Sequence, residues 1–371
     1  MRADAIGLYV HIPFCVRKCN YCDFASTDKH TENLRRDYID ALIREIKSYN
    51  RESPIAVDTV FFGGGTPSVL SPEEFRKISS AIRETFDLSD VKEITVEANP
   101  KTLTAEKCEA YRTAGVNRIS IGLQSIHENE QKSLGRIHNL DDFLLSFELV
   151  RTYFDNLSVD LMYGIPHQTK ESFAETLAAV SALPVKHISV YGLIVEEGTP
   201  FGRMRDTLPL PTEDEEADMY RLAKNMLSRS GFSHYEISNY AREGYECQHN
   251  LKYWRAEEYV GVGVAAASYF DKKRYVNSSD ISEYLAADFT NYNRRYEIPD
   301  EKFEYAMLRL RLREGISLPD YEARFSESFL SDREELIREY TARGLVECRD
   351  GRLFFTDEGF YISNYLLIEL L

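Results

Sequence analysis

Three cysteines within eight residues are the feature of this chain that most directly indicates chemistry. Cys15, Cys19 and Cys22 are spaced C-x3-C-x2-C, whereas the other three cysteines are scattered. Three thiolates on one short loop can hold a metal that keeps an open coordination position. The spacing therefore predicts a metal centre close to the start of the chain.

Two kinds of centre fit that spacing. A zinc ion would take His11, His30 or Asp23 as its fourth ligand. An iron–sulfur cluster usually takes four thiolates, so three would leave one iron free for an exchangeable ligand. The spacing alone does not decide between the two.

Residues that are mostly glycine or polar recur where a short apolar run ends. These positions are Gly63, Gly64, Gly65, Thr66, Glu97, Asn99, Gln124, Ser125, Asp160, Tyr163, Tyr191 and Ile194. The runs that precede them have the β-branched and aromatic composition of strands. In parallel α/β sheets, the loops after the carboxyl ends of the strands carry the active groups. We therefore expect these residues and the cysteines to share one mouth.

Each of these positions also has a purely structural interpretation. The three glycines fit a tight turn between strand and helix as well as a close backbone approach to a ligand. Glu97 and Asp160 fit buried ion pairs as well as ligand contacts. Arg136 and His138 lie in a predicted loop, where a surface role is the simpler interpretation.

The elements that would position these residues alternate along the first two thirds of the chain. Strands are predicted at 7–12, 58–62, 93–98, 118–123, 157–162 and 187–194. Between them, apolar residues recur every three or four positions, as in the predicted helices at 34–49 and 75–86. Capping boxes, formed by Ser71 with Glu74 and by Thr212 with Glu215, mark two helix starts. Six such units predict an α/β fold, either an incomplete TIM-like barrel or a doubly wound open sheet.

The pattern changes after residue 232. Residues 234–241 predict one more strand, residues 244–270 are irregular and glycine-rich, and the chain becomes helical from about 300. Asp350-Gly351 between two apolar runs is a hairpin signal. We expect a barrel domain over 1–232, an extension over 233–300 and a small α+β, winged-helix-like domain over 301–371. A structural cap explains that last domain better than DNA binding does.

Composition excludes several classes of function. The chain has 371 residues, and 45 Lys and Arg against 61 Asp and Glu give a net charge of −16. Such a surface repels nucleic acid and anionic lipid. The longest apolar run is far shorter than the ~20 residues that span a bilayer, and no secretory leader is recognisable. We expect a cytoplasmic protein that binds no nucleic acid; its oligomeric state, a homodimer included, stays open.

Several segments, taken in order, carry a family resemblance. They are Tyr9-Val-His-Ile-Pro-Phe-Cys15, Cys19-Asn-Tyr-Cys22, Gly-Gly-Gly-Thr-Pro at 63–67, Val96-Glu-Ala-Asn-Pro100, Ser120-Ile-Gly-Leu-Gln-Ser125 and Asp160-Leu-Met-Tyr-Gly-Ile-Pro166. Together they resemble the radical S-adenosylmethionine superfamily, in its oxygen-independent coproporphyrinogen III oxidase branch. The resemblance covers nearly the whole chain. It implies a 4Fe-4S cluster in place of zinc and an incomplete (β/α)6 barrel.

The resemblance also implies a role for each matching residue. Cys15, Cys19 and Cys22 would hold three irons, and the fourth iron would take the amine and carboxylate of S-adenosyl-L-methionine. The residues implied for binding that cofactor are Tyr9, Tyr21, Gly64, Thr66, Glu97, Gln124, Arg136, Asp160 and the backbone near Ile194. A reduced cluster could then cleave the sulfonium to a 5′-deoxyadenosyl radical.

The resemblance leaves two functions within this branch. One is the oxidase, which decarboxylates two propionates of coproporphyrinogen III; the other is a heme chaperone, which resembles the oxidase but binds heme for delivery. The chaperone is favoured because Phe24 stands where the oxidase usually has a further cysteine. It is also favoured because only eight residues precede Tyr9, where the oxidase usually has a long extension.

A third feature that favours the chaperone is the segment His249-Asn250-Leu-Lys-Tyr253-Trp254, which matches its H-N-x-x-Y-W motif. A histidine can ligate heme iron, and Tyr253 and Trp254 can stack on a porphyrin face. In the structural alternative, His249 and Asn250 hydrogen-bond a loop while Trp254 fills a core. The remainder of the resemblance favours the heme interpretation.

We therefore predict a heme chaperone that carries a 4Fe-4S cluster, binds S-adenosyl-L-methionine and transfers heme to an unidentified acceptor. The alternatives are the oxidase itself and a protein whose zinc or cluster is only structural. Cys247 is a second candidate for the heme ligand. Ala265-Ala266-Ala267 follow a Gly-x-Gly after which this branch often has a histidine, so this chain lacks that residue.

Overall fold

The six strands predicted in the first two thirds of the chain form a parallel sheet in chain order. A computed structural model describes residues 5–290, 292 and 294–371. The strands are β1 (Ile6–Ile12), β2 (Val57–Gly64), β3 (Glu93–Ala98), β4 (Arg118–Gln124), β5 (Asn156–Tyr163) and β6 (His187–Gly192). Each pairs in parallel with the next. This sequential order confirms the incomplete barrel and excludes the doubly wound sheet, whose strand order reverses.

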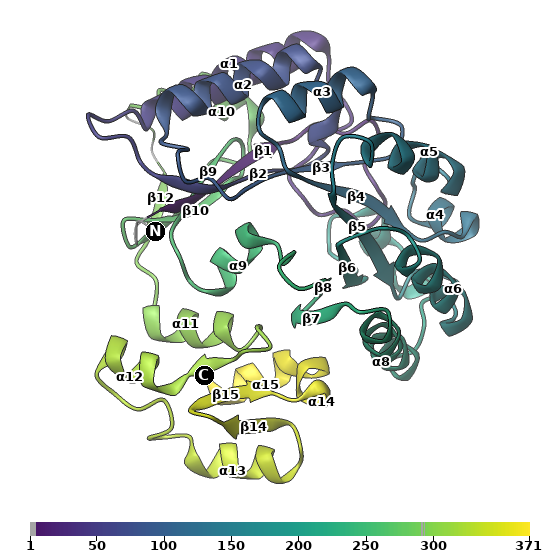
Figure 1. The fold of residues 1–371 in the computed structure, drawn as a ribbon, viewed down its shortest axis with the longest axis vertical. Coiled ribbons are helices and arrows are strands. Elements are labelled where there is room, and N and C mark those ends of the chain that lie inside the picture. Colours follow the sequence, from purple (N-terminus) through teal and green to yellow (C-terminus); the bar gives the residue numbers. More distant parts are fainter. Residues whose placement is uncertain (1–4, 291, 293) are drawn as a thin grey trace.

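Helices cover the outer side of the curved sheet (Figure 1). They are α1 (Glu32–Ser48), α2 (Pro72–Thr85), α3 (Ala105–Thr113), α4 (Glu128–Ser133), α5 (Leu140–Val150), α6 (Lys170–Ser181) and α8 (Glu213–Arg229). The predicted capping boxes are present, because Ser71 caps α2 reciprocally with Glu74 and Thr212 caps α8 reciprocally with Glu215. Short turns of helix are η1 (Pro67–Val69), α7 (Pro200–Arg203) and η2 (Arg205–Thr207).

Further strands extend the sheet at both edges. At one edge, β7 (Ser233–Glu236) and β8 (Asn239–Ala241) form a hairpin beside β6, where the sequence predicts a single strand. At the other, β9 (Tyr259–Val262) pairs in parallel with β1. It is followed by β10 (Ala267–Phe270), β11 (Lys273–Val276), α10 (Ile281–Ala286) and β12 (Arg295–Glu297). The twelve-stranded sheet runs in the order β12-β11-β10-β9-β1-β2-β3-β4-β5-β6-β8-β7.

The interpretation of residues 244–270 as irregular is wrong. They hold β9, β10 and the helix α9 (Gln248–Trp254), which lies on the inner side of the curved sheet (Figure 1). The carboxylate of Glu93, on β3, accepts hydrogen bonds from the backbone N–H groups of Gln248 (3.0 Å) and His249 (3.2 Å). A residue more than 150 positions away thus supplies the helix's first-turn acceptor, which no local pattern predicts.

The C-terminal part has its own three-stranded sheet. Its elements are α11 (Glu301–Arg309), β13 (Ile316–Ser317), α12 (Leu318–Phe325), α13 (Glu334–Ala342), β14 (Val346–Arg349), β15 (Arg352–Phe355), α14 (Asp357–Tyr361) and α15 (Ser363–Leu370). Asp350 and Gly351 join β14 to β15 with φ values of 52° and 73°. Two positive φ values are typical of a type I′ turn, so the predicted hairpin is confirmed.

Two apolar cores reflect this division, beside a third, small cluster that includes Met162, Ile165 and Phe201. The larger fills the space between the sheet and its outer helices, and the smaller is built mainly from residues 305–370. Tyr220, on α8, belongs to the smaller core. The domain boundaries at 232 and 300 stay predictions. Within the described ranges, no helix combines the length and the apolar character that crossing a bilayer requires.

A buried carboxylate ties α1 to the strands beyond β9. Glu45 is fully buried and accepts hydrogen bonds from the Gly263 N–H (2.7 Å), Tyr284 Oη (2.7 Å), Asn277 Nδ2 (2.8 Å) and Arg294 Nη2 (2.9 Å). A buried charge is stable only when its partners satisfy it in this way. Glu45 therefore fixes the start of the loop that leads from β9 into β10.

We expect Glu45→Ala to lower the free energy of unfolding by about 3 kcal/mol, because it leaves the Arg294 guanidinium buried without its charge partner. Urea denaturation followed by circular dichroism measures the change. The control is Glu84→Ala, which removes an exposed ion pair to Lys47 and should change stability by less than about 1 kcal/mol. Equal effects of the two substitutions would contradict this account.

Candidate functional site

The cysteine loop, residues 13–27, follows β1 and is closed by hydrogen bonds at its base. The Cys15 N–H donates to the Thr27 carbonyl (2.9 Å), and the Thr27 N–H donates to the Pro13 carbonyl (2.7 Å). His11, the next-to-last residue of β1, hydrogen-bonds through Nε2 to the Ala25 carbonyl (2.8 Å). The strand end therefore holds both ends of the loop.

All three cysteines of this loop are free thiols. Cys15 Sγ accepts a hydrogen bond from Thr66 Oγ1 (3.6 Å), and Cys19 Sγ accepts one from Arg136 Nη1 (3.7 Å). Burial raises the pKa of the Cys15 and Cys22 thiols, and the other cysteines of the loop raise it further. Negative charge on one of these sulfurs therefore disfavours negative charge on the others.

This donor set fits a cluster held by three thiolates. The loop gathers soft sulfur ligands, hydrogen-bond donors reach two of them, and the Arg136 guanidinium offsets negative charge beside Cys19. Among residues 5–290, 292 and 294–371, the structure contains no group of three or more His, Cys, Asp or Glu side chains that could hold a metal ion.

The glycines after β2 make room for the cysteine loop. The Gly65 N–H donates to the Ile12 carbonyl (2.8 Å). A Cβ atom on Gly65 would lie 2.9 Å from the Phe14 carbonyl oxygen and 3.0 Å from Cys15 Sγ. Gly64 has φ of 108°, which other residues rarely adopt. The close backbone approach predicted here is an approach to the chain's own cysteine loop.

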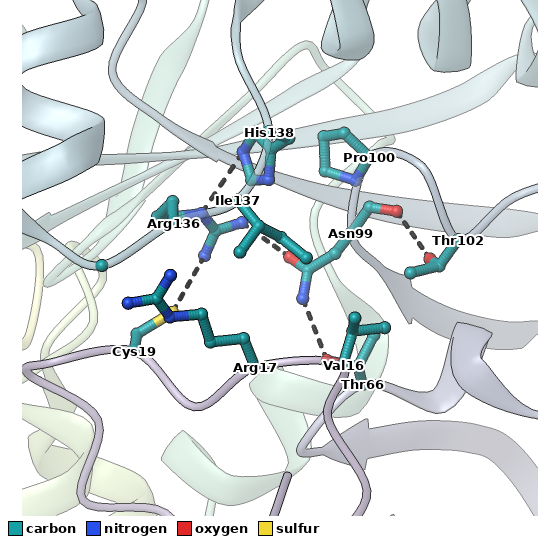
Figure 2. A pocket seen from close by; sticks show the side chains of 11 residues that line it. Val16, Arg17, Cys19, Thr66, Asn99, Pro100, Thr102, Arg136, Ile137 and His138 are labelled. Atoms are coloured by element: carbon teal, nitrogen blue, oxygen red, sulfur yellow. Dashed lines mark hydrogen bonds between the residues drawn. The ribbon is translucent and has the colours of Figure 1, made fainter.

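Arg136 links the cysteine loop to the ends of β3 and β4, in a small pocket of about 30 Å³ (Figure 2). Its Nη2 donates to Asn99 Oδ1 (2.7 Å) and the Gly122 carbonyl (2.6 Å), its Nε to His138 Nε2 (3.3 Å) and its Nη1 to Cys19. The surface-loop interpretation of Arg136 and His138 is therefore wrong. Every guanidinium nitrogen of Arg136 already donates to an acceptor in the protein. A bound carboxylate would therefore have to share one of these nitrogens with that acceptor.

A much larger cavity, of about 570 Å³, occupies the inner side of the sheet. Its lining combines predicted site residues with others that the sequence analysis did not single out for a binding role. The predicted ones are Tyr9, His11, Asp23, Gly64, Glu97, Asp160, Tyr191, Asn250 and Tyr253. The others include Phe61, Arg118, Ser120 and Ser189, while Asp23, Phe24 and Ala25 come from the cysteine loop.

Two carboxylic acids stand on the inner face of the sheet. Burial, and next the charge of Asp160, raise the pKa of Glu97 to about 8, although its Oε2 accepts a hydrogen bond from the Gly64 N–H (3.3 Å). Burial also raises the pKa of Asp160, which accepts hydrogen bonds from Ser120 (3.0 Å) and Ser189. Both acids line the cavity, and neither is within ion-pair distance of a cation in the described part of the chain.

His249 does not present a free nitrogen for heme iron. Its ring is fully buried and stacks on Phe61, with 5.3 Å between ring centroids. Nδ1 hydrogen-bonds Thr59 Oγ1 (2.9 Å), and Nε2 hydrogen-bonds Tyr253 Oη (2.8 Å). Burial lowers the pKa of His249 to about 3, so the ring is neutral. Direct ligation would require one of these bonds to break.

Among the other residues of the H-N-x-x-Y-W segment, two line the cavity and one contacts a buried carboxyl group. Asn250 and Tyr253 line the cavity, whereas the Trp254 indole hydrogen-bonds the buried carboxyl of Glu236. Cys247 is fully buried, and its Sγ donates to Glu93 (3.4 Å). His249 is therefore enclosed by side chains of the protein, whereas Trp254 is only half-buried and does not fill a core.

Three remaining cofactor residues do not line the large cavity. Tyr21 hydrogen-bonds Arg136, and Ile194 is 69% exposed. Gln124 is buried, has φ of 72°, and its Oε1 has no partner. A strained backbone beside an unpartnered buried amide is typical of a position held for a ligand.

The spacing of polar residues along the strands could have identified the cavity-lining residues that were not predicted. Arg118 and Ser120 alternate along β4, and Ser189 follows the same rule on β6. Alternate positions of a strand share one face. Polar residues at such spacing, inside otherwise apolar strands, indicate a polar inner face.

Comparisons with known proteins agree with this geometry. The profile of the Radical SAM superfamily matches residues 9–180, and that of the HemN C-terminal domain matches residues 299–362. A protein named heme chaperone HemW from Lactococcus lactis subsp. lactis (strain IL1403) is 36% identical, over 98% of this chain and 96% of that one. HemW of Escherichia coli (strain K12) is 35% identical, over 99% of this chain and 98% of that one.

The fold has a solved counterpart. The coproporphyrinogen III oxidase HemN from Escherichia coli, described as a radical SAM enzyme, superposes with a TM-score of 0.86 over 99% of this chain and 90% of that one. The identity is 22%, so this likeness concerns the fold alone.

The raised pKa of Glu97 predicts a pH-dependent stability. The folded protein keeps this carboxyl protonated up to about pH 8, whereas the unfolded chain loses the proton near 4.5. Stability from this group is therefore complete below pH 4.5 and is lost as the pH rises towards 8.

We expect Glu97→Gln, which cannot ionise, to gain stability relative to the wild type between pH 5 and pH 8, by on the order of 1 kcal/mol. Urea denaturation at several pH values measures it, with the exposed Glu84→Gln as the control. Parallel pH profiles of wild type and Glu97→Gln would contradict the raised pKa.

Proposed function

This chain belongs to the HemW family within the radical SAM superfamily, and we propose that it binds heme and transfers it to an acceptor protein. Membership rests on relatives at 35–36% identity over nearly the whole chain. The observation that carries the proposal is the 570 Å³ cavity whose wall includes Asn250 and Tyr253 of the H-N-x-x-Y-W segment. A cavity of that size, whose wall combines aromatic residues with polar and charged ones, suits one large planar ligand.

The cysteine loop holds the second cofactor of this proposal. Cys15, Cys19 and Cys22 would ligate a 4Fe-4S cluster, with Thr66 and Arg136 donating to two of the sulfurs. When bound together, the cluster and S-adenosyl-L-methionine supply reductive cleavage of a sulfonium. The protein's part is to hold three thiolates, place the cofactor beside them and exclude water.

The residues proposed for S-adenosyl-L-methionine lie between that loop and the cavity. Tyr9, Gly64, Glu97 and Asp160 face the cavity, and their oxygen and N–H groups suit an amine and ribose hydroxyls. The unpartnered Gln124 Oε1 offers a further acceptor. Tyr21, Thr66, Arg136 and the backbone near Ile194 complete the set.

The H-N-x-x-Y-W segment provides the proposed heme wall. Tyr253 faces the cavity, and His249 holds the Tyr253 hydroxyl while Thr59 holds His249. We assign His249 the role of positioning Tyr253, in place of ligating iron. Asn250 adds a polar contact, and Trp254 anchors the end of α9 through Glu236. A cytoplasmic location and an acceptor protein belong to the same proposal.

The cysteine loop predicts the behaviour of single thiol variants. Cys19→Ala should abolish the visible absorbance of the reconstituted cluster and leave the far-ultraviolet circular dichroism unchanged, because Cys19 is not part of the barrel core. Anaerobic reconstitution with iron and sulfide, followed by iron and sulfide analysis, measures it. The matched control is Cys348→Ala, an exposed cysteine on β14, which should keep the full cluster. An intact cluster in Cys19→Ala would refute the assignment.

Heme titration of the reconstituted protein tests the function directly. We expect one heme per chain, and no decarboxylation when the same sample is given coproporphyrinogen III under reducing, anaerobic conditions. His249→Ala and Tyr253→Phe should each weaken heme binding about fivefold, and the double variant should be no weaker than either, because the two side chains act as one unit.

The titration can fail in two ways that separate the alternatives. Decarboxylation with little heme binding would make the protein an oxidase. Heme binding with fully additive effects of His249→Ala and Tyr253→Phe would keep the chaperone function but remove the positioning role of His249.

A further inference from the structure

Arg118 is a buried cation that the fold leaves without an acceptor. It is the first residue of β4, only 2% of its surface is exposed, and it lines the large cavity. Its Nε has no hydrogen-bond partner, and no described residue forms an ion pair with its guanidinium. A buried charge without a partner is energetically unfavourable. Such a group is therefore rare unless a bound ligand supplies the missing partner.

The acidic groups nearest to Arg118 are occupied elsewhere. Glu93, Asp160, Cys247 and Tyr235 all act on its charge. Glu93 uses both carboxylate oxygens on Cys247 and on the first N–H groups of α9. Asp160 accepts from Ser120 and Ser189. These neighbours balance the charge of Arg118 without accepting a hydrogen bond from its Nε, and Arg118 stands in the wall of the cavity.

A guanidinium with free N–H groups prefers a carboxylate, which it can bind in a two-pronged geometry. Ser120 and Ser189 line the same cavity, and their hydroxyl groups donate to Asp160. Heme carries two propionate carboxylates. We infer that Arg118 receives a heme propionate inside the barrel, an assignment that rests on the proposed heme-binding function.

The carboxylate of S-adenosyl-L-methionine could also bind a guanidinium. Its expected position in the protein argues against a contact with Arg118. That group is expected beside the cysteine loop, at the carboxyl ends of the strands. Arg118 begins β4 and Gln124 ends it. Six residues of extended chain span about 20 Å. A carboxylate held at the cysteine loop therefore does not reach Arg118, whereas the propionate of a large macrocycle inside the cavity does.

The first test needs no substitution. Wild-type protein is titrated with heme and with heme dimethyl ester, whose propionates are neutral. We expect heme to bind about tenfold more tightly or better, since a hydrogen bond to a charged group is lost in the ester. Equal affinity for the two would overturn the inference and leave the proposed function standing. Binding of neither would overturn both.

The second test assigns the preference to one residue. Arg118→Gln should reduce heme affinity to about that of the ester and leave ester affinity unchanged. The control Arg76→Gln, an exposed arginine on α2, should change neither. A loss shared equally by heme and ester, or no loss at all, would overturn the inference.

Two further measurements keep the result interpretable. Arg118→Lys retains the charge, so it should keep a preference for heme over the ester even if Arg118→Gln is poorly folded; an equal affinity for both in Arg118→Lys would count against the inference. The affinity for S-adenosyl-L-methionine should be the same in wild type and in both variants. A loss of that affinity with heme binding intact would assign Arg118 to the other carboxylate.

Discussion

Charge balance inside the curved sheet is the constraint on which the rest of this structure depends. The inner face carries Glu93 and Arg118, which are buried, and Glu97 and Asp160, which are half-buried in the wall of the cavity. Because a lone buried charge is unstable, each must be neutralised, hydrogen-bonded or protonated. Glu93 is satisfied by the N-terminus of α9, and Glu97 keeps its proton because its pKa is raised to about 8. Arg118 retains a positive charge in the wall of the cavity, and its Nε has no hydrogen-bond partner.

This balance separates the interior into two ends with different chemistry. The end at the cysteine loop offers sulfur ligands, with Thr66 and Arg136 donating to them. The other end, at the start of β4 and beside α9, offers a cation and the Tyr253 hydroxyl. One cavity reaches from loop residues such as Phe24 to Arg118. We therefore propose that a cluster with its cofactor and a large macrocycle occupy neighbouring parts of one interior.

Local sequence patterns predicted the features that local physics decides. The strand runs, the capping boxes at Ser71 and Thr212, and the turn at Asp350-Gly351 were all found in place, because each depends on neighbours within a few residues. The helix α9 was missed, since its acceptor Glu93 lies on a distant strand. The orientation of His249 was beyond prediction for the same reason: Thr59, 190 residues away, fixes its ring. The H-N-x-x-Y-W motif identified the candidate heme-binding residues, but the packing of α9 on the sheet determines which of them face the cavity.

Iron-edge anomalous diffraction from crystals of the cluster-loaded, heme-loaded protein tests the central claim most directly. The account predicts one group of iron peaks beside Cys15, Cys19 and Cys22, and one further iron inside the cavity between the sheet and α9. A heme iron on the outer surface of the barrel or on the C-terminal domain would contradict a shared interior. The absence of iron peaks at the cysteine loop would contradict the cluster assignment itself.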